Sequence, residues 1–399
     1  MQFIFLWQHN YPLLYVPAMS IHRQLFIQLM QPLNIVFRTR DFYLLFINFN
    51  TKPITMITTE NIYTFIQFDD YSLTPKYLQL CNSIIKAVQE GNISQDYLLP
   101  SINNLSYELE IGRNTVEKAY KYLKRYGFIK SVPGKGYFIS CKESQISPSV
   151  CLIFNKLSVH KKIIYDTFTK ALGVNAIVDL YIYNNDFSLF KHILNLKRDN
   201  YSHFVIIPHF VDGGNYADEI INTIPKEKLI LMSQLVSGVS GEYGAVFEDF
   251  EKEIYNALSA ALARLRKYKK IQIIFPENTY HPEAILDGFS KFCMDHQFEH
   301  QVIRNIDNAC IQAETVYISL MEDDLVVLVK KILETGFKVG AEIGIISYNE
   351  TPIKQIILNG ITTISADFKF MGEMAAKFIK DGLKQQLAVP FYLTLRNSL

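Results

Sequence analysis

The strongest chemical signal in this 399-residue sequence is a run of basic residues between Arg113 and Lys142. Lysine or arginine occurs eight times in this stretch and Glu117 is its only acidic residue, so the local charge is eight minus one, or +7. The basic positions are Arg113, Lys118, Lys121, Lys124, Arg125, Lys130, Lys135 and Lys142. A field of this sign suits the phosphates of double-stranded DNA, and the net charge of +1 for the whole chain hides it.

Helices are predicted just before this basic run. Thr74 and Pro75 form a good helix start, a capping hydroxyl followed by a proline at the first helical position, and Gly91 ends that amphipathic helix. A second, shorter helix is predicted to begin at Ser101, whose side chain can cap it.

The basic residues themselves fall on a third helix and on a hairpin. The helix is predicted from about Arg113 to Tyr126, after a break at 110–112. Two short helices joined by a tight, glycine-containing turn form a helix-turn-helix. Two short β-type runs, 128–132 and 137–140, follow and are joined by Pro-Gly-Lys-Gly, which predicts a wing. The alternative, a solvated basic helix face, explains neither the turn nor the wing.

Residues 75–140 resemble the DNA-binding domain of the GntR family of transcription regulators. The resemblance rests on the LPS element at 99–101, the R-x-T-V start of the third helix at 113–116 and the G-x-G-Y wing tip at 134–137. It implies that Arg113 and Asn114 contact base edges, while other residues approach phosphates or the minor groove. The implied set is Ser101, Asn103, Arg113, Asn114, Thr115, Lys118, Lys121, Lys135, Gly136 and Tyr137.

Two positions depart from the family pattern. Many members have arginine where this sequence has Asn103 and Glu117, so the operator sequence of better-known relatives does not transfer. On the same helix four residues are expected in the core and not at DNA: Val116, Ala119, Tyr120 and Leu123.

The remainder of the chain alternates apolar runs with amphipathic segments, which predicts parallel sheets with helices on both faces. The pattern starts at 150, restarts at 271 and indicates two α/β lobes. The predicted strands are 150–154, 176–183, 203–208, 229–232, 271–275, 315–320 and 343–347. Two such lobes form a cleft at the carboxyl ends of their strands, where ligands of these folds bind. The predicted fold class is therefore α/β, a winged helix-turn-helix followed by a two-lobed sensor.

Residues 150–399 resemble the LacI-type, periplasmic-binding-protein-like regulatory domain. The resemblance rests on DGF at 287–289, DDL at 323–325, IGIISYNE at 343–350 and the closing segment at 361–379. It implies that His281, Asp323 and Asn349 line the cleft, and that Ile285 replaces an arginine that commonly contacts sugars. Polar residues near strand ends or the return crossing are further candidates, although each could be an ordinary loop or cap residue: Ser158, His160, His209, Glu248 and Asp367.

The combination of the two domains is similar to sugar-utilisation regulators of the arabinose and fucose type. This similarity implies a monosaccharide effector, a homodimer and a palindromic operator. A repressor is the expected type of regulator. The sequence leaves open whether the effector releases DNA or strengthens its binding.

The first 60 residues are atypical, crowded with apolar side chains but without a helical or strand period. We expect Met56 to be the working start, with a membrane-associating segment as the alternative, since Pro12, Pro17, Pro32 and charged residues interrupt every apolar run. N-terminal mass spectrometry would distinguish these readings. The expected domains are this extension (1–60), the winged helix-turn-helix (70–141), a linker (142–149) and the sensor (150–399).

Other classes of protein find no support in the sequence. The five cysteines are scattered and never spaced C-x-x-C, and the nine histidines show no ligand spacing, so we expect neither disulfides nor a metal, and a cytoplasmic location. No catalytic motif or aminotransferase-like half is evident, so we expect no enzyme activity and no cofactor. A transporter's solute-binding protein would need export and would leave the helix-turn-helix unexplained.

Overall fold

The computed structural model describes residues 61–140, 148–173 and 176–399. The expected N-terminal extension at 1–60, including Met56, lies outside the described residues, as does all of the expected linker except its last two positions. The first sensor strand, β4, begins at Ser149 and therefore includes the last residue of that linker.

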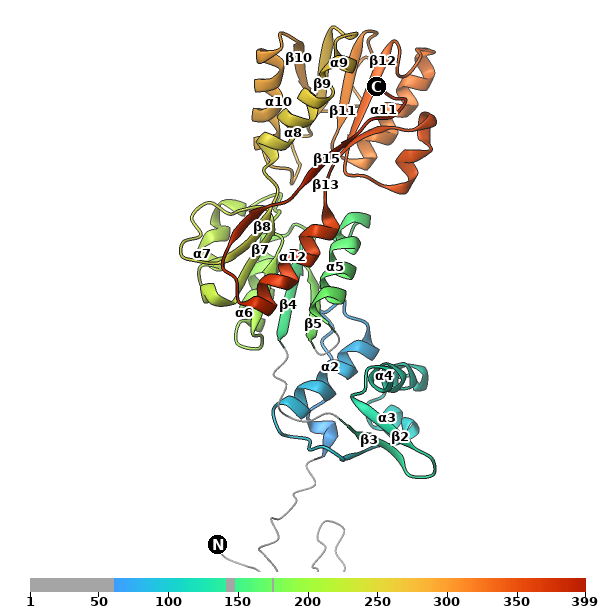
Figure 1. Cartoon of the computed structure of the whole chain (residues 1–399), viewed down its shortest axis with the longest axis vertical. Helices are drawn as coiled ribbons and strands as arrows, with labels where there is room; N and C mark the ends of the chain where they lie inside the picture. The colour runs from blue at the N-terminus through green and yellow to red at the C-terminus, as the bar shows by residue number, and fades with distance from the viewer. Residues whose placement is uncertain (1–60, 141–147, 174–175) are drawn as a thin grey trace, which may run out of the picture. The chain divides into compact units, whose positions relative to one another are not determined.

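The N-terminal domain is a winged helix-turn-helix (Figure 1). Its sheet is antiparallel, in the order β1-β3-β2, and the pairing of β1 with the wing was not predicted from the sequence. Its elements are η1 (Ile62–Thr64), α2 (Lys76–Gln89), β1 (Leu98–Leu99), α3 (Ile102–Glu108), α4 (Arg113–Arg125), β2 (Ile129–Val132) and β3 (Gly136–Ile139).

One local detail of this domain differs from the expectations. Pro75 is the N-cap of α2 and makes no capping hydrogen bond, whereas Thr74 accepts the backbone N–H of Leu180 at 2.9 Å through its hydroxyl. The prediction that Thr74 caps the helix was wrong because the edge strand β5 of the sensor donates a hydrogen bond to that hydroxyl.

In the turn between α3 and α4, Glu110 takes the left-handed conformation (φ 52°), and Gly112 is the N-cap of α4.

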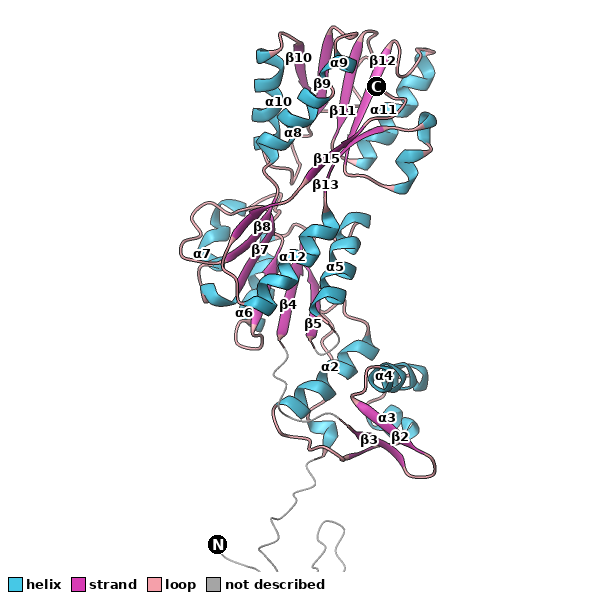
Figure 2. Ribbon diagram, viewed as in Figure 1, coloured by secondary structure: helices cyan, strands magenta, loops and turns pink. Residues whose placement is uncertain are grey.

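The first sensor sheet is entirely parallel, in the order β14-β8-β7-β6-β4-β5, and defines lobe 1 (Figure 2). Its strands are β4 (Ser149–Phe154), β5 (Ile177–Ile182), β6 (His203–Ile206), β7 (Leu229–Ser233), β8 (Gly244–Phe247) and β14 (Gln386–Ala388). Its helices are α5 (Val159–Leu172), α6 (Phe187–Lys197), η2 (Gly214–Tyr216), α7 (Ala217–Ile221), η3 (Lys226–Lys228) and α12 (Phe368–Asp381).

The second sheet, in the order β10-β9-β11-β12-β13-β15, defines lobe 2 and is parallel except for its edge strand β15. Its strands are β9 (Lys270–Ile274), β10 (Glu299–Ile303), β11 (Thr315–Ser319), β12 (Ile343–Tyr348), β13 (Thr362–Ala366) and β15 (Phe391–Thr394). Its helices are α8 (Phe250–Ala260), α9 (Leu262–Leu265), α10 (Ala284–Asp295), α11 (Glu322–Thr335), η4 (Pro352–Gln355) and η5 (Ile357–Asn359).

The lobes are not simply successive, because the chain passes between the two sheets three times (Figure 1). It leaves lobe 1 after β8, returns after β13 to form α12 and β14, and crosses again to add β15 to lobe 2. Lobe 1 therefore contains segments from both ends of the sensor sequence, and lobe 2 contains its middle and its last strand.

The return of the chain is held by the packing of α12 against α5. The interface is buried and includes Ile164, Phe168, Met371 and Ala375. Gly372 lies at its closest point, since a Cβ there would be 2.2 Å from the hydroxyl oxygen of Thr167 and 2.6 Å from the carbonyl oxygen of Ile164. The two helices approach this closely because position 372 has no side chain.

The N-terminal domain is joined to lobe 1 along the edge strand β5. Leu73 donates its backbone N–H to the carbonyl of Leu180 at 2.8 Å, and Ser72 forms an antiparallel bridge with Tyr181. Asp69 accepts a hydrogen bond from the Tyr181 hydroxyl at 2.7 Å and pairs with Lys197. An unpaired edge strand is thereby covered by the segment that leads into α2.

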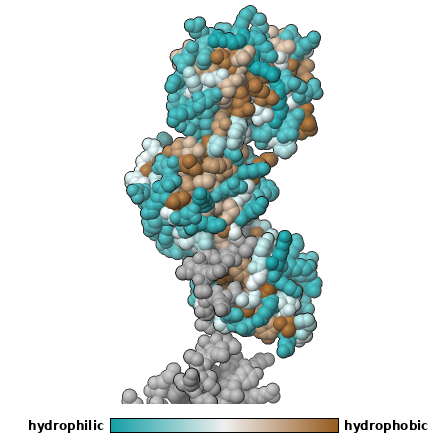
Figure 3. Space-filling view, viewed as in Figure 1, coloured by the Kyte–Doolittle hydropathy of each residue, from teal (hydrophilic) through white to brown (hydrophobic). Residues whose placement is uncertain are grey.

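Hydrophilic residues predominate on the surface seen in Figure 3, with smaller hydrophobic patches among them. None of the helices in the described part of the chain has the length and apolar character required to span a bilayer.

Substitution Gly372→Ala should destabilise the sensor, by about 1–3 kcal/mol, because the added methyl group overpacks the α12–α5 interface. Helix propensity alone predicts the opposite sign, since alanine is favoured over glycine by about 0.8–1 kcal/mol. Urea denaturation of the full chain followed by circular dichroism measures the difference. Glu373→Ala, at the exposed neighbouring position, is the control and should be close to neutral; an equally stable Gly372→Ala protein would contradict the prediction.

Candidate functional site

Helix α4 presents one buried face and one exposed face. Val116, Ala119, Tyr120 and Leu123 are at most 1% exposed, which confirms that they belong to the core. The predicted contact residues on the same helix are largely on the other face: Arg113, Asn114, Lys118 and Lys121 are exposed and Thr115 is half-buried. The amphipathic pattern thus positions the basic side chains toward solvent, where DNA could reach them.

The two residues that depart from the GntR pattern both contact Arg113. Its Nε donates a hydrogen bond to Oδ1 of Asn103 at 3.2 Å, and its guanidinium lies 3.5 Å from the carboxylate of Glu117. Lys121 lies 2.8 Å from the same carboxylate and, mainly through its hydrogen bond, holds the pKa of Glu117 below its usual value. The charge of Lys121 is therefore partly offset, whereas Lys118 has no ion pair among the described residues.

The remaining predicted contacts flank α4. The Ser101 hydroxyl oxygen accepts the backbone N–H of Asn104 at 3.1 Å as the N-cap of α3, so its hydroxyl proton remains available to a phosphate. Lys135 and Gly136 are exposed at the wing turn. Tyr137 is half-buried, and its ring packs edge-on against Tyr120 at 4.8 Å, so it also supports the core.

A cavity between the sensor lobes brings together five of the eight predicted effector residues. They are His160, His209, Glu248, His281 and Asn349. The space inside it that is clear of side chains is only about 30 Å³, far less than a small-molecule site measures, so the cavity is narrow in this arrangement of the lobes. Both lobes contribute, with residues that follow β4, β6 and β8 on one side and residues that follow β9 and β12 on the other.

One wall of the cavity is a hydrogen-bonded chain of three side chains. The Ser233 hydroxyl donates to Oε1 of Glu248 at 2.7 Å, and Nε2 of His209 lies 2.8 Å from the Ser233 oxygen. If Ser233 donates to Glu248, Nε2 of a neutral His209 must donate to Ser233, which leaves Nδ1 as an acceptor. His209 is 5% exposed and its Nδ1 has no partner among the described residues.

Two lysine side chains lie near the Tyr280 ring. The Lys161 side chain is buried and donates to Oδ1 of Asn155, and Lys156 lies 4.3 Å from the centre of the Tyr280 ring. The Tyr280 ring in turn lies beside His281, with centroids 4.6 Å apart. Tyr280 of lobe 2 is therefore the aromatic surface on which these lobe 1 cations meet.

Burial lowers the pKa of every basic group that lines the cavity. It lowers the pKa of His160 and of His281 to about 3, with the charges of nearby lysines adding to the effect. Burial and then the charge of Lys156 lower the pKa of Lys161 to about 7. The pKa of Glu248 is raised by burial, so both signs of charge are destabilised in the site as it stands.

Three predicted residues lie outside the cavity lining. Ser158 caps α5 and its hydroxyl lies 3.1 Å from Nδ1 of His160. Asp367 caps α12, accepting the backbone N–H of Phe370 at 2.9 Å, and Asp323 is exposed in the first turn of α11. Ile285, expected at the place of a sugar-contacting arginine, is fully buried in the core of lobe 2 and does not line the cavity.

Among the polar residues that line the cavity, sequence reasoning missed four: Lys161, Ser233, Tyr280 and Tyr348. Ser233 ends strand β7, and its position at a strand end was the signal that could have found it. Lys161 and Tyr280 carried no comparable signal, because lysine in a first helical turn and tyrosine in a loop are ordinary surface residues.

Among the residues that the structure describes, no cluster of histidine, cysteine, aspartate or glutamate has the arrangement of a metal site. The side chains that line the cavity offer recognition through hydrogen bonds and charge.

Comparison with known proteins defines the class of the N-terminal domain. Residues 76–139 match the family model described as bacterial regulatory proteins, gntR family, so this domain is a GntR-type winged helix-turn-helix. The chain is 37% identical over 75 residues to the HTH-type transcriptional repressor YtrA of Bacillus subtilis and 30% identical over 66 residues to the arabinose metabolism transcriptional repressor of Geobacillus stearothermophilus. These matches cover 19% and 16% of this chain, and they span 58% and 18% of the relatives' lengths.

The sensor has the LacI-type, periplasmic-binding-protein-like fold. The trehalose repressor of Escherichia coli superposes with a TM-score of 0.52 at 16% identity, over 62% of this chain and 100% of that one. A periplasmic binding protein/LacI transcriptional regulator from Alkaliphilus metalliredigens, solved in complex with D-xylulofuranose, superposes with a TM-score of 0.50 at 13% identity, over 63% and 99%. The mixed α/β architecture predicted from the sequence is thereby confirmed.

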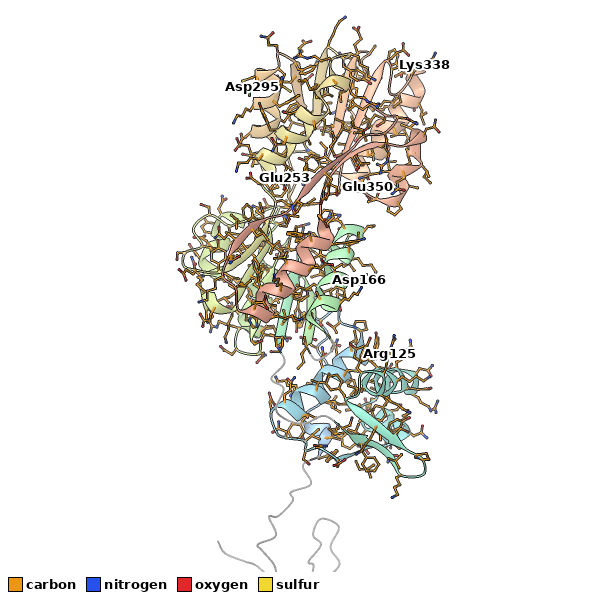
Figure 4. All side chains as sticks on the ribbon, in the orientation of Figure 1. Arg125, Asp166, Glu253, Asp295, Lys338 and Glu350 are labelled. Atoms are coloured by element: carbon orange, nitrogen blue, oxygen red, sulfur yellow. The ribbon has the colours of Figure 1, made fainter. Side chains whose placement is uncertain are left out.

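Replacement of Glu253 by glutamine should stabilise the protein at pH 8 and have little effect at pH 5. Glu253 is 6% exposed at the start of α8, labelled in Figure 4, and its Oε2 has no partner among the described residues. Burial, followed by the charge of Glu248, raises its pKa well above the usual 4.5. The unfolded carboxyl ionises above about pH 4.5 while the folded one resists, so stability is lost as the pH rises.

Urea denaturation of both proteins at the two pH values measures this effect. The exposed Glu251→Gln on the same helix is the control and should show no pH-dependent gain. An equal effect of Glu253→Gln at pH 5 and pH 8 would argue against a protonated Glu253.

Proposed function

We propose that this protein is a DNA-binding transcription repressor whose affinity for its operator is controlled by a small molecule in the cleft of its sensor. The observation that carries the proposal is the exposed basic face of α4 within a GntR-type domain, joined in one chain to a LacI-type sensor. Its operator is double-stranded DNA with two half-sites, and a homodimer presents one α4 to each.

The effector that we propose is a monosaccharide. The arabinose repressor among the relatives and the xylulofuranose complex among the similar structures support a sugar. The His209–Ser233–Glu248 chain supports it independently, because an unpartnered imidazole acceptor beside a carboxyl group suits the hydroxyl groups of a sugar.

The control of DNA binding follows from thermodynamic linkage between the binding of the effector and the binding of DNA. Little of the cavity is clear of side chains, so a bound sugar changes the separation of the lobes. Lobe 1 is bonded to the N-terminal domain through β5, so a change in the lobes alters the placement of α4 relative to its copy in the dimer. The effector controls DNA binding to the extent that its affinity differs between the two arrangements.

Arg113 and Lys118 should have distinguishable effects on DNA binding. After selection of the preferred site from random duplexes, Arg113→Ala should cost about 1–3 kcal/mol at that site and little on random DNA, because Arg113 contacts base edges. Lys118→Ala should weaken both alike and reduce the salt slope by about 1, because Lys118 contacts phosphate. Fluorescence anisotropy of the full chain at several salt concentrations measures both quantities. Identical behaviour of the two variants would refute this division of roles.

A sugar of the correct class should stabilise the folded protein. A thermal-shift screen of the full chain against pentoses, hexoses, deoxysugars and their phosphates should yield a member that adds about 2.7 kcal/mol at a hundred times its Kd. Ser233→Ala should reduce that shift, because it breaks the chain between His209 and Glu248, whereas the exposed Ser188→Ala should not. A shift that survives Ser233→Ala in full would place the ligand elsewhere.

A further inference from the structure

The cavity between the lobes has an unequal balance of ionisable groups. Four basic side chains line it, His160, Lys161, His209 and His281, against the single carboxyl group of Glu248. Its remaining polar lining, Asn349 included, is uncharged. The three imidazoles can bind the hydroxyl groups of a neutral sugar, whereas the buried ammonium group of Lys161 is not required for that purpose.

Lys161 is the most unusual member of the set. It is 4% exposed, and among the described residues no carboxylate lies within 4 Å of its ammonium group. Its hydrogen-bond partner is the neutral amide of Asn155. A buried ammonium group without a counter-ion is costly, so its retention at the cavity wall points to a negative partner that binds there.

The backbone around Lys161 favours the same sign of ligand. His160 and Lys161 lie in the first turn of α5, a 14-residue helix whose first turn contains no acidic residue. The N-terminus of a helix carries a partial positive charge and unpaired N–H groups, which attract anions. Lys156, just before the helix, adds a second ammonium group over the Tyr280 ring.

Two further atoms indicate that a ligand completes this site. Nδ1 of His209, on a side chain 95% buried, and Nε2 of His281 are buried without hydrogen-bond partners among the described residues. His209 extends from lobe 1 and His281 from lobe 2, so a ligand that satisfies both would bridge the lobes.

The single carboxyl group of the lining already has a hydrogen-bond partner. Glu248 is engaged by Ser233, which connects it to His209, and this wall suits hydroxyl groups. The site therefore offers a buried ammonium group, that of Lys161, together with hydrogen-bonding groups that suit hydroxyls.

We propose that the effector is a small polyhydroxy compound with a negatively charged group, a phosphate ester or a carboxylate, and that this group binds at Lys161 and the N-terminal end of α5. The inference rests on the proposed function and specifies the ligand class of the same cleft. It assigns Lys161 as the residue that distinguishes a charged sugar from its neutral parent.

Binding of the anion also takes up protons. The groups that face Lys161 are Lys156, His160, His209, Glu248, Tyr280 and His281. In the free site the pKa of Lys161 is lowered to about 7 by burial and by Lys156, against the opposing charge of Glu248. An anion beside it raises that pKa, so the complex holds more protons than the free protein between about pH 7 and pH 8.

The test is a thermal-shift and calorimetric comparison of matched pairs on the full chain. Each pair consists of a neutral sugar and its charged counterpart: pentose and pentose phosphate, hexose and hexose phosphate, hexose and hexuronic acid. Inorganic phosphate alone probes the anion end. We expect one charged member to bind at least about tenfold more tightly than its neutral parent and than inorganic phosphate.

Lys161→Met should remove that preference, whereas Lys162→Met, at the exposed neighbouring position that pairs with Asp166, should retain it. Calorimetry of the unsubstituted protein in two buffers of different ionisation enthalpy gives the proton uptake without any variant. Net uptake near pH 7.5 is expected for the charged ligand.

The outcomes separate the two proposals. A neutral sugar that binds as tightly as its charged counterpart, or a charge preference that survives Lys161→Met, overturns the anionic effector and leaves the sugar-controlled regulator intact. Absence of proton uptake overturns the role of Lys161. No binding by any member of any pair overturns the sugar effector as well, while the DNA-binding assays still stand.

Discussion

The close packing of α12 against α5 is the constraint on which the sensor depends. The chain crosses between the sheets three times, and the burial of α12 in lobe 1, together with the pairing of β14 with β8, holds the returning segment in place. Gly372 permits the contact, because any side chain there would meet the backbone of α5. The first turn of α5, at the opposite end of β4 from the linker, thereby acquires a fixed position at the cavity, and His160 and Lys161 with it.

Electrostatics acts in opposite ways at the two ends of the molecule. On α4 the cations are exposed, so their field extends into solvent and Glu117 offsets only its two neighbours, Arg113 and Lys121. In the sensor cavity the basic groups are buried, so burial suppresses their charge until a partner restores it. The exposed cations of α4 suit a large polyanion such as DNA. The buried basic groups of the cavity suit a small ligand.

The coupling between these ends depends on contacts that have no sequence signature. The edge of β5 is covered by residues 72–74, so lobe 1 and the N-terminal domain share backbone hydrogen bonds. The sequence predicts Thr74 as a helix cap because local sequence indicates only which nearby backbone groups its hydroxyl could bond. The structure shows the bond that it makes with Leu180, more than a hundred residues away.

The sequence by itself determined the elements and their class. Periodicity, caps and turn residues defined α3, α4, the wing and the first strands of each lobe, because those signals are local and repeat at 3.6 or two residues. Strand ends also indicated three residues of the cavity, His160, His209 and Glu248, and the LacI-type resemblance indicated His281 and Asn349. Tertiary structure alone decided that Lys161 and Tyr280 join them, that Asp323 and Ile285 do not, and that β14 joins the first sheet and β15 the second. The physical reason is that burial and charge pairing depend on residues distant in sequence, and only the folded chain brings them together.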